Sequence, residues 1–198
     1  MIRSMVISLV LLGLLMSPAV PQGPEDPVQV EILTELGPIT VELYPDRAPG
    51  TVANFLRYVD GGFFTGGSFH RTVHGENQPN DSIRIAVIQG DIDRGRRQDA
   101  FDAIDLERTH ITGLKHVDGA ISMARGGPDT ATSSFFICVG DQPELDYEGR
   151  RNPDGQGFAA FGVVLEGMDV VRAINRSPSE EQSLLPPIEI LGIRRIQL

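Results

Sequence analysis

Apolar and polar positions alternate on both sides of Gly37-Pro38. A period of two places every second side chain on the same face of a strand, and a Gly-Pro pair is typical of a turn. The pattern therefore predicts a β-hairpin. Its apolar positions are Val30, Ile32, Leu36, Ile39, Val41 and Leu43.

The spacing then changes to that of a helix. Val52, Phe55, Leu56 and Val59 stand at i, i+3, i+4 and i+7, after a proline and before the pair Gly61-Gly62. Proline is favoured in the first turn of a helix, and glycine is favoured just beyond its end. We expect one amphipathic helix that packs on a sheet.

Short β-type segments follow, separated by connectors rich in Gly, Asn, Asp and Pro. A second helix is predicted from Met168 to Asn175, and a last strand contains Ile188, Ile190, Ile193 and Ile196. Because closure of a sheet removes its exposed edges, these isoleucines are expected to pair with the first hairpin. The fold class is mainly β, an antiparallel barrel capped by helices. The intervening strands are expected at 68–73, 83–89, 119–123, 134–139 and 158–165.

The first 19 residues resemble a secretory signal peptide. Arg3 precedes an apolar stretch, residues 5–16, that ends at the small residues Ser17-Pro18-Ala19. Cleavage is expected near Ala19, followed by a flexible spacer, residues 20–27, and one folded domain, residues 28–198. The protein is therefore expected in the periplasm or secreted. An uncleaved leader that tethers the domain to a membrane is the alternative.

Composition narrows the function classes. The 198 residues suffice for one substantial core, and the net charge of −10 should repel nucleic acid and anionic membranes. Cys138 lies in an apolar run and is expected to be a buried hydrophobe. His70 and His74 lie on a predicted strand and loop, where their spacing does not favour zinc. We expect no metal and no other cofactor.

Several short motifs follow one another along the chain: Phe69-His70-Arg71, Gln89-Gly90-Asp91, Leu114-Lys115-His116, Ile121-Ser122-Met123-Ala124, Gly127-Pro128, Ser133-Ser134-Phe135-Phe136-Ile137, Phe161-Gly162-Val163-Val164 and Glu166-Gly167-Met168. In these motifs and in their order, the chain resembles the cyclophilin family from about Val30 to the C-terminus. This resemblance implies an eight-stranded antiparallel barrel with two capping helices and catalysis of rotation about the bond before proline. Its implied partners are proline-containing peptides and folding exported proteins, and the protein is expected to be a monomer.

The same resemblance implies a site. Arg71 matches the family's catalytic arginine. Phe136 matches the aromatic floor for the proline ring, and Leu145 matches an apolar wall. The other substrate-binding residues that it implies are Gln89, Ala124, Val87, Ser134 and Phe158.

Several of these positions depart from the family pattern. Ala86 and Val87 are smaller than the family's phenylalanine and methionine, so the pocket is expected to be shallower or completed from elsewhere. Ser134 replaces a glutamine and Phe158 replaces a histidine. Glu144 replaces a tryptophan that many eukaryotic members carry, so weak inhibition by cyclosporin is expected. The loops 72–82 and 147–157 are long and could gate access or bind partners.

Rotation about an X-Pro bond needs no nucleophile, metal or redox group, because no covalent bond changes. Its barrier of about 18–20 kcal/mol reflects amide resonance. In the twisted state the prolyl nitrogen has a localised lone pair, which a guanidinium can bond only there. The main hypothesis is therefore an isomerase. The alternatives are a proline-peptide binding module or chaperone with little catalysis, suggested by Ala86, Val87 and Ser134, and a tethered scaffold.

Overall fold

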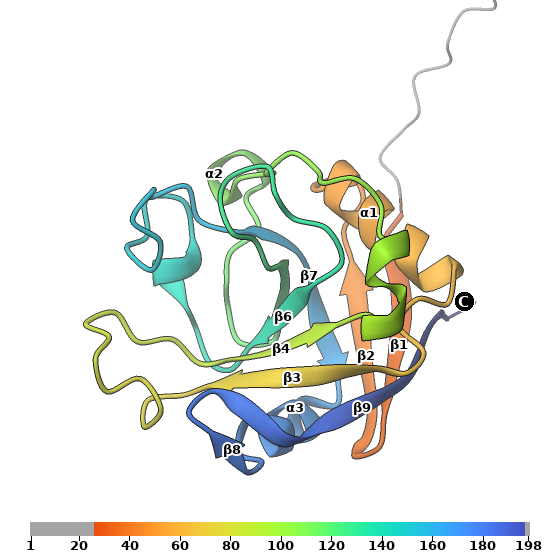
Figure 1. Ribbon diagram of the computed structural model, residues 1–198. Coiled ribbons are helices and arrows are strands. Elements are labelled where there is room, and N and C mark those ends of the chain that lie inside the picture. Colours follow the sequence, from red (N-terminus) through yellow and green to blue (C-terminus); the bar gives the residue numbers. More distant parts are fainter. Residues whose placement is uncertain (1–25, 197–198) are drawn as a thin grey trace, which may run out of the picture.

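The computed structural model describes residues 26–196, which form one closed antiparallel barrel (Figure 1). The sheet has nine strands, in the order β1-β2-β7-β5-β6-β4-β3-β9-β8, and a further pairing of β1 with β9 closes it. The short strand β8 pairs only with β9, so the other strands form the predicted eight-stranded ring. The strands are β1 (Val28–Thr34), β2 (Gly37–Leu43), β3 (Gly67–Val73), β4 (Val87–Asp91), β5 (Ala120–Met123), β6 (Phe135–Cys138), β7 (Ala159–Glu166), β8 (Ser179–Glu180) and β9 (Ser183–Arg195).

The predicted hairpin and the predicted closure are both confirmed. β1 pairs with β2 so that Ile32 faces Ile39, and β1 also pairs with β9 so that Ile32 faces Ile193. All three side chains are buried. The last strand begins earlier than the isoleucines indicated, at Ser183, because it continues along β3 as far as the pair Arg71 and Ser183.

Both predicted helices are present. α1 (Pro49–Asp60) packs against β7 and β9, and α3 (Met168–Asn175) packs against β2, β3 and β4. The N-terminus of α1 is capped from a distance, because the carboxylate of Glu107 accepts hydrogen bonds from the amide nitrogens of Gly50 at 3.1 Å and Thr51 at 2.8 Å. A carboxylate there satisfies free N–H groups and complements the helix dipole.

Three short helices were not predicted from the sequence. They are α2 (Thr109–Thr112) and the 3-10 helices η1 (Arg94–Asp99) and η2 (Pro143–Leu145). η1 contains the basic residues Arg94, Arg96 and Arg97, two of which contact neighbouring side chains. The Arg96 guanidinium lies 3.7 Å from the centre of the Phe63 ring, and Arg97 pairs with Asp91 at 2.9 Å.

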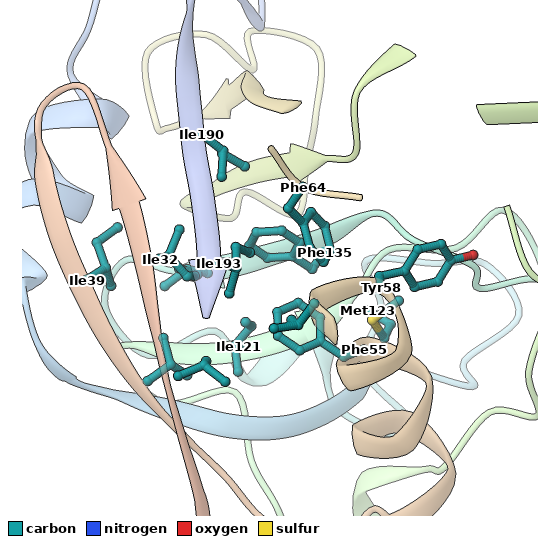
Figure 2. Close-up of a cluster of buried hydrophobic side chains, with 14 of the residues drawn as sticks. Ile32, Ile39, Phe55, Tyr58, Phe64, Ile121, Met123, Phe135, Ile190 and Ile193 are labelled. Atoms are coloured by element: carbon teal, nitrogen blue, oxygen red, sulfur yellow. The ribbon is translucent and has the colours of Figure 1, made fainter. Parts of the chain in front are cut away.

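An aromatic cluster fills the centre of the barrel (Figure 2). The ring of Phe135 lies 5.5 Å from those of Phe55 and Phe64 and 5.7 Å from that of Phe69, each in edge-on contact. Aromatic pairs favour this geometry. Phe136 belongs instead to a smaller cluster with Val73, Ile85, Val87, Ala120, Cys138 and Leu145. Phe135 and Phe136 thus point to opposite faces of β6, as expected for neighbours on a strand.

Cys138 is buried in this smaller cluster, and burial raises the pKa of its thiol far above the usual value. It packs as a small hydrophobe, as its apolar neighbours indicated. The predicted signal peptide, residues 1–19, and most of the predicted spacer lie outside the described residues. Within residues 26–196, no helix has both the length and the apolar character needed to cross a bilayer.

Phe135→Ala should lower the free energy of unfolding by about 3–5 kcal/mol, because it leaves a cavity where several aromatic rings meet. Urea unfolding followed by circular dichroism measures this change. Leu36→Ala is the matched control, since Leu36 is 45% exposed. Its effect should stay within about 0.5 kcal/mol. Similar losses in both variants would contradict the assignment of the core.

Candidate active site

A pocket of about 210 Å³ opens on the outer wall of the barrel, over β3, β4 and β6. All of the site residues implied by the sequence line it except Ser134. It also contains residues that the sequence analysis did not identify. The lining residues are Arg71, Ile85, Val87, Gln89, Ala124, Arg125, Phe136, Leu145, Arg151, Asn152 and Phe158.

Two aromatic rings form the apolar part of this pocket. Phe136 is 5% exposed, and the Phe158 ring meets it edge-on at 5.3 Å and 88°. On its other side, Phe136 stacks on the imidazole of His116 at 5.9 Å and 13°. Leu145, from η2, is almost fully buried in the same cluster. The pocket is therefore a hollow with rigid apolar walls.

Ile85 completes the pocket where smaller residues had suggested a shallow one. Ile85 and Val87 line it whereas Ala86 does not, consistent with the alternation of side chains along an extended chain. The backbone of Ile85 is held by the buried side chain of Gln78, which donates to the Ile85 carbonyl at 2.7 Å and accepts from its amide at 3.2 Å. The alternation with Val87 was the signal in the sequence that could have identified Ile85.

Arg71 lies half-buried at one edge of the pocket. Its Nη1 donates to Gln89 Oε1 at 2.9 Å, across the β3–β4 pair in which these two residues face each other. Its Nε and Nη2 both donate to Gln182 Oε1, at 3.0 and 2.6 Å. Gln182 was not predicted from the sequence. Burial and then the charge of Arg151 lower the pKa of Arg71, and Asp81 acts in the opposite direction.

Gln89 is oriented by Ser134. Gln89 Nε2 donates to Ser134 Oγ at 3.0 Å, and this hydroxyl donates to the carbonyl of Gly90 at 3.1 Å. Ser134 was expected to face the substrate, but in the structure it is not a lining residue. Its hydroxyl fixes which end of the Gln89 amide faces Arg71.

Two backbone amides in the segment after β5 have partners within the chain. The amide of Ala124 donates to Ser134 O at 2.9 Å, and that of Gly126 donates to Thr130 Oγ1 at 3.1 Å. These two amides are therefore already bonded within the chain. The side chain of Ala124 still lines the pocket.

Two further arginines frame the pocket. The side chain of Arg125 is 1% exposed, pairs with Asp154 at 2.8 Å and lies 4.9 Å from the centre of the Phe158 ring. Arg151 donates to Asp81 Oδ2 at 3.0 Å and to the carbonyl of Ile83 at 2.7 Å. The Arg151–Asp81 pair joins the two long loops, 72–82 and 147–157, beside the pocket.

A serine, a histidine and an aspartate are also hydrogen-bonded behind the aromatic wall. His116 Nδ1 lies 2.8 Å from Asp146 Oδ1, and its Nε2 lies 3.0 Å from Ser122 Oγ. Burial lowers the pKa of His116 more than its bond to Asp146 raises it, so the imidazole is neutral near pH 7. Ser122 is 0% exposed. With no access for a substrate, this cluster supports the Phe136 ring rather than nucleophilic chemistry.

The four histidines do not form a metal centre in the described part of the chain. No group of three or more His, Cys, Asp or Glu side chains among residues 26–196 is placed to hold a metal ion. His116 is engaged as described, and the ring of His110 lies 3.9 Å from that of Tyr147.

A second, larger cavity lies on the other side of Arg71. It measures about 770 Å³ and is bounded by the loop from His74 to Asp81 and by the turn before β9. Its lining is mostly polar and includes Gln182. Arg71 is thus placed between two cavities of different character.

Comparison with known proteins agrees with the motifs in the sequence. The family model described as cyclophilin-type peptidyl-prolyl cis-trans isomerase matches residues 29–195. A peptidyl-prolyl cis-trans isomerase of Acinetobacter baylyi is 34% identical over 83% of this chain and 84% of its own length. Peptidyl-prolyl cis-trans isomerase B of Escherichia coli is 34% identical over 71% of this chain and 80% of its own.

The fold is also similar to that of solved structures. A cyclophilin-type peptidyl-prolyl cis-trans isomerase of Cryptosporidium parvum matches with a TM-score of 0.70 and 23% identity, over 87% of this chain and 99% of its own. A second structure of that protein, determined in the presence of the dipeptide Ala-Pro, matches with a TM-score of 0.68. The barrel, the pocket beside Arg71 and the sequence relatives lead to one conclusion: this chain belongs to the cyclophilin-type peptidyl-prolyl cis-trans isomerase family.

Proposed function

We propose that this protein catalyses rotation about X-Pro bonds with Arg71 as the group that stabilises the twisted imide, and that it acts on exported proteins. The observation that carries the catalytic part is the position of Arg71. Its guanidinium borders an apolar hollow that contains the ring of Phe136. The pocket volume of about 210 Å³ is large enough for a pyrrolidine ring.

The required stabilisation is modest. Lowering a barrier of about 18–20 kcal/mol to the roughly 13 kcal/mol of a rate near 10³ per second takes about 6 kcal/mol. A donor aimed at the atom where a lone pair develops supplies about 3 kcal/mol in a site that excludes water. Interactions that hold the proline ring while the preceding carbonyl turns can supply the rest, provided that they are stronger in the twisted state.

Arg71 has hydrogen-bond donors left for this purpose. A guanidinium carries five N–H groups. The bonds to Gln89 and Gln182 use the Nε hydrogen and one hydrogen on each terminal nitrogen. One hydrogen on each of Nη1 and Nη2 is therefore free to face a bound imide. The apolar walls keep competing water away from the prolyl nitrogen.

The catalytic proposal is favoured over that of a binding module. The module was suggested by the small residues at positions 86 and 87, but Ile85 supplies the missing wall. The relatives described above are named as peptidyl-prolyl cis-trans isomerases, and this chain matches them over most of their length. Proline-containing peptides are the substrate class in this proposal, and a single chain contains the whole pocket.

The proposal of export is supported by the sequence of the first 19 residues, which combines Arg3, an apolar stretch and small residues before Val20. Folding proteins outside the cytoplasm would then be its substrates.

Arg71→Ala should lower kcat/KM for a short Ala-Pro-Phe peptide about 100-fold, the loss expected for one well-aimed donor. A protease-coupled assay measures it, and NMR exchange between the cis and trans peaks measures the same step without a protease. Arg194→Ala is the control, because Arg194 is an exposed surface residue paired with Glu31. Equal turnover by the wild type and Arg71→Ala would overturn the role of Arg71. Peptide binding without exchange in the wild type would favour the module.

Ile85→Ala should raise KM roughly tenfold and change kcat much less, because it opens one apolar wall and leaves the Arg71 network in place. Steady-state kinetics on the same peptide series separates the two constants. An unchanged KM would show that Ile85 does not contact the substrate.

Expression of the full chain in a bacterial host, followed by N-terminal sequencing of the exported fraction, tests the leader. The mature protein should begin near Val20. An intact Met1 on membrane-bound protein would instead support the tether.

A further inference from the structure

Gln182 is 111 residues from Arg71 in the sequence, but its backbone is hydrogen-bonded to β3, the strand that contains Arg71. It lies between β8 and β9, in a turn where Glu181 has a φ of 52°. Its carbonyl accepts a hydrogen bond from the amide of Thr72 at 2.9 Å, and the next residue, Ser183, faces Arg71 in the β3–β9 pair. The backbone of this turn is therefore fixed in register with the arginine.

The side-chain amide of Gln182 is fixed in orientation as well. Its Nε2 donates to the carbonyl of Asn77 at 3.4 Å. Asn77 is itself held, because its side chain accepts from the His74 amide at 2.8 Å and donates to the carbonyl of Thr72 at 3.0 Å. With its nitrogen facing Asn77, the amide presents Oε1 to Arg71.

Oε1 of Gln182 accepts from two nitrogens of Arg71, Nε at 3.0 Å and Nη2 at 2.6 Å. Two bonds along one edge of a planar guanidinium fix both its position and its tilt. Gln89 holds the other terminal nitrogen at 2.9 Å. Both acceptors are neutral, so they orient the guanidinium without cancelling its charge.

Three carboxylates, those of Glu76, Asp81 and Glu181, line the large cavity, and Asp81 is the one whose charge acts on the pKa of Arg71. Asp81 lines the large cavity beside Arg71, and its carboxylate pairs with Arg151 at 3.0 Å. A carboxylate in place of the Gln182 amide would form a two-bond ion pair with Arg71. The negative charge of this permanent partner would weaken the guanidinium as a hydrogen-bond donor to the substrate.

We propose that Gln182 is a positioning residue for catalysis, which fixes the Arg71 guanidinium through a neutral acceptor and so leaves its charge and two N–H groups for the twisted imide. This inference rests on the proposed role of Arg71. It adds a requirement that the acceptor be both present and uncharged.

The test compares Gln182→Ala, which removes the acceptor, with Gln182→Glu, which keeps an acceptor of nearly the same shape and adds a negative charge. Ser183→Ala is the matched control, since Ser183 is the next residue, at the start of β9, and is exposed. Each full-length variant is assayed for kcat and KM on an Ala-Pro-Phe peptide. The Nε–Hε signal of Arg71, assigned by its loss in Arg71→Ala, is followed by NMR.

Gln182→Ala should lower kcat about tenfold with KM nearly unchanged, as expected when a group acting in the transition state loses its orientation. The Arg71 signal should broaden or move toward that of a solvent-exposed arginine. In Gln182→Glu the Arg71 signal should stay sharp but be shifted from its wild-type position. The kcat of this variant should fall at least as far as that of Gln182→Ala. Ser183→Ala should match the wild type in both respects.

Wild-type kcat in Gln182→Ala would overturn the proposal, and so would wild-type kcat in Gln182→Glu. A fall of kcat in Ser183→Ala equal to that in Gln182→Ala would also overturn it, by showing a general effect of the turn. Failure of the proposed role of Arg71 is recognised separately, because Arg71→Ala itself would then keep wild-type turnover.

Discussion

The pairing of β9 with two strands is the constraint on which both the barrel and the site depend. Along β1, this strand places Ile193 opposite Ile32 and closes the ring. Along β3, it places Ser183 opposite Arg71. The turn that precedes β9 consequently delivers Gln182 to the guanidinium. A shift of β9 by one residue would expose its buried isoleucines, so the core also protects the geometry of the site.

Strand β6 lies between the central hydrophobic core and the smaller hydrophobic cluster beside the pocket. Phe135 faces the central aromatic cluster, whereas Phe136 faces the pocket, where the neutral ring of His116 supports it from behind. Burial keeps this imidazole neutral, and hydrogen bonds to Asp146 and Ser122 hold it in place.

The sequence predicted the parts of the molecule that are governed by regular spacing. The hairpin, both longer helices and the closing strand followed from apolar periods, and the family motifs indicated all of the lining residues that lie on regular strands. The role of Gln182 was not predicted, because its partner Arg71 is 111 residues away in the sequence and a glutamine in a polar turn belongs to no periodic pattern. Arg125, Arg151 and the Glu107 cap were missed for the same reason. Their partners become neighbours only after folding.

The ion pair between Arg151 and Asp81 joins two loops that rest on the barrel without forming part of its ring. One consequence is that these loops do not vary independently of the site. The first loop lines the larger cavity and its Asn77 accepts a hydrogen bond from Gln182, and the second loop contributes Arg151 to the pocket. A substitution that breaks this ion pair therefore acts at once on the lining of the pocket and on the support of the arginine beside it.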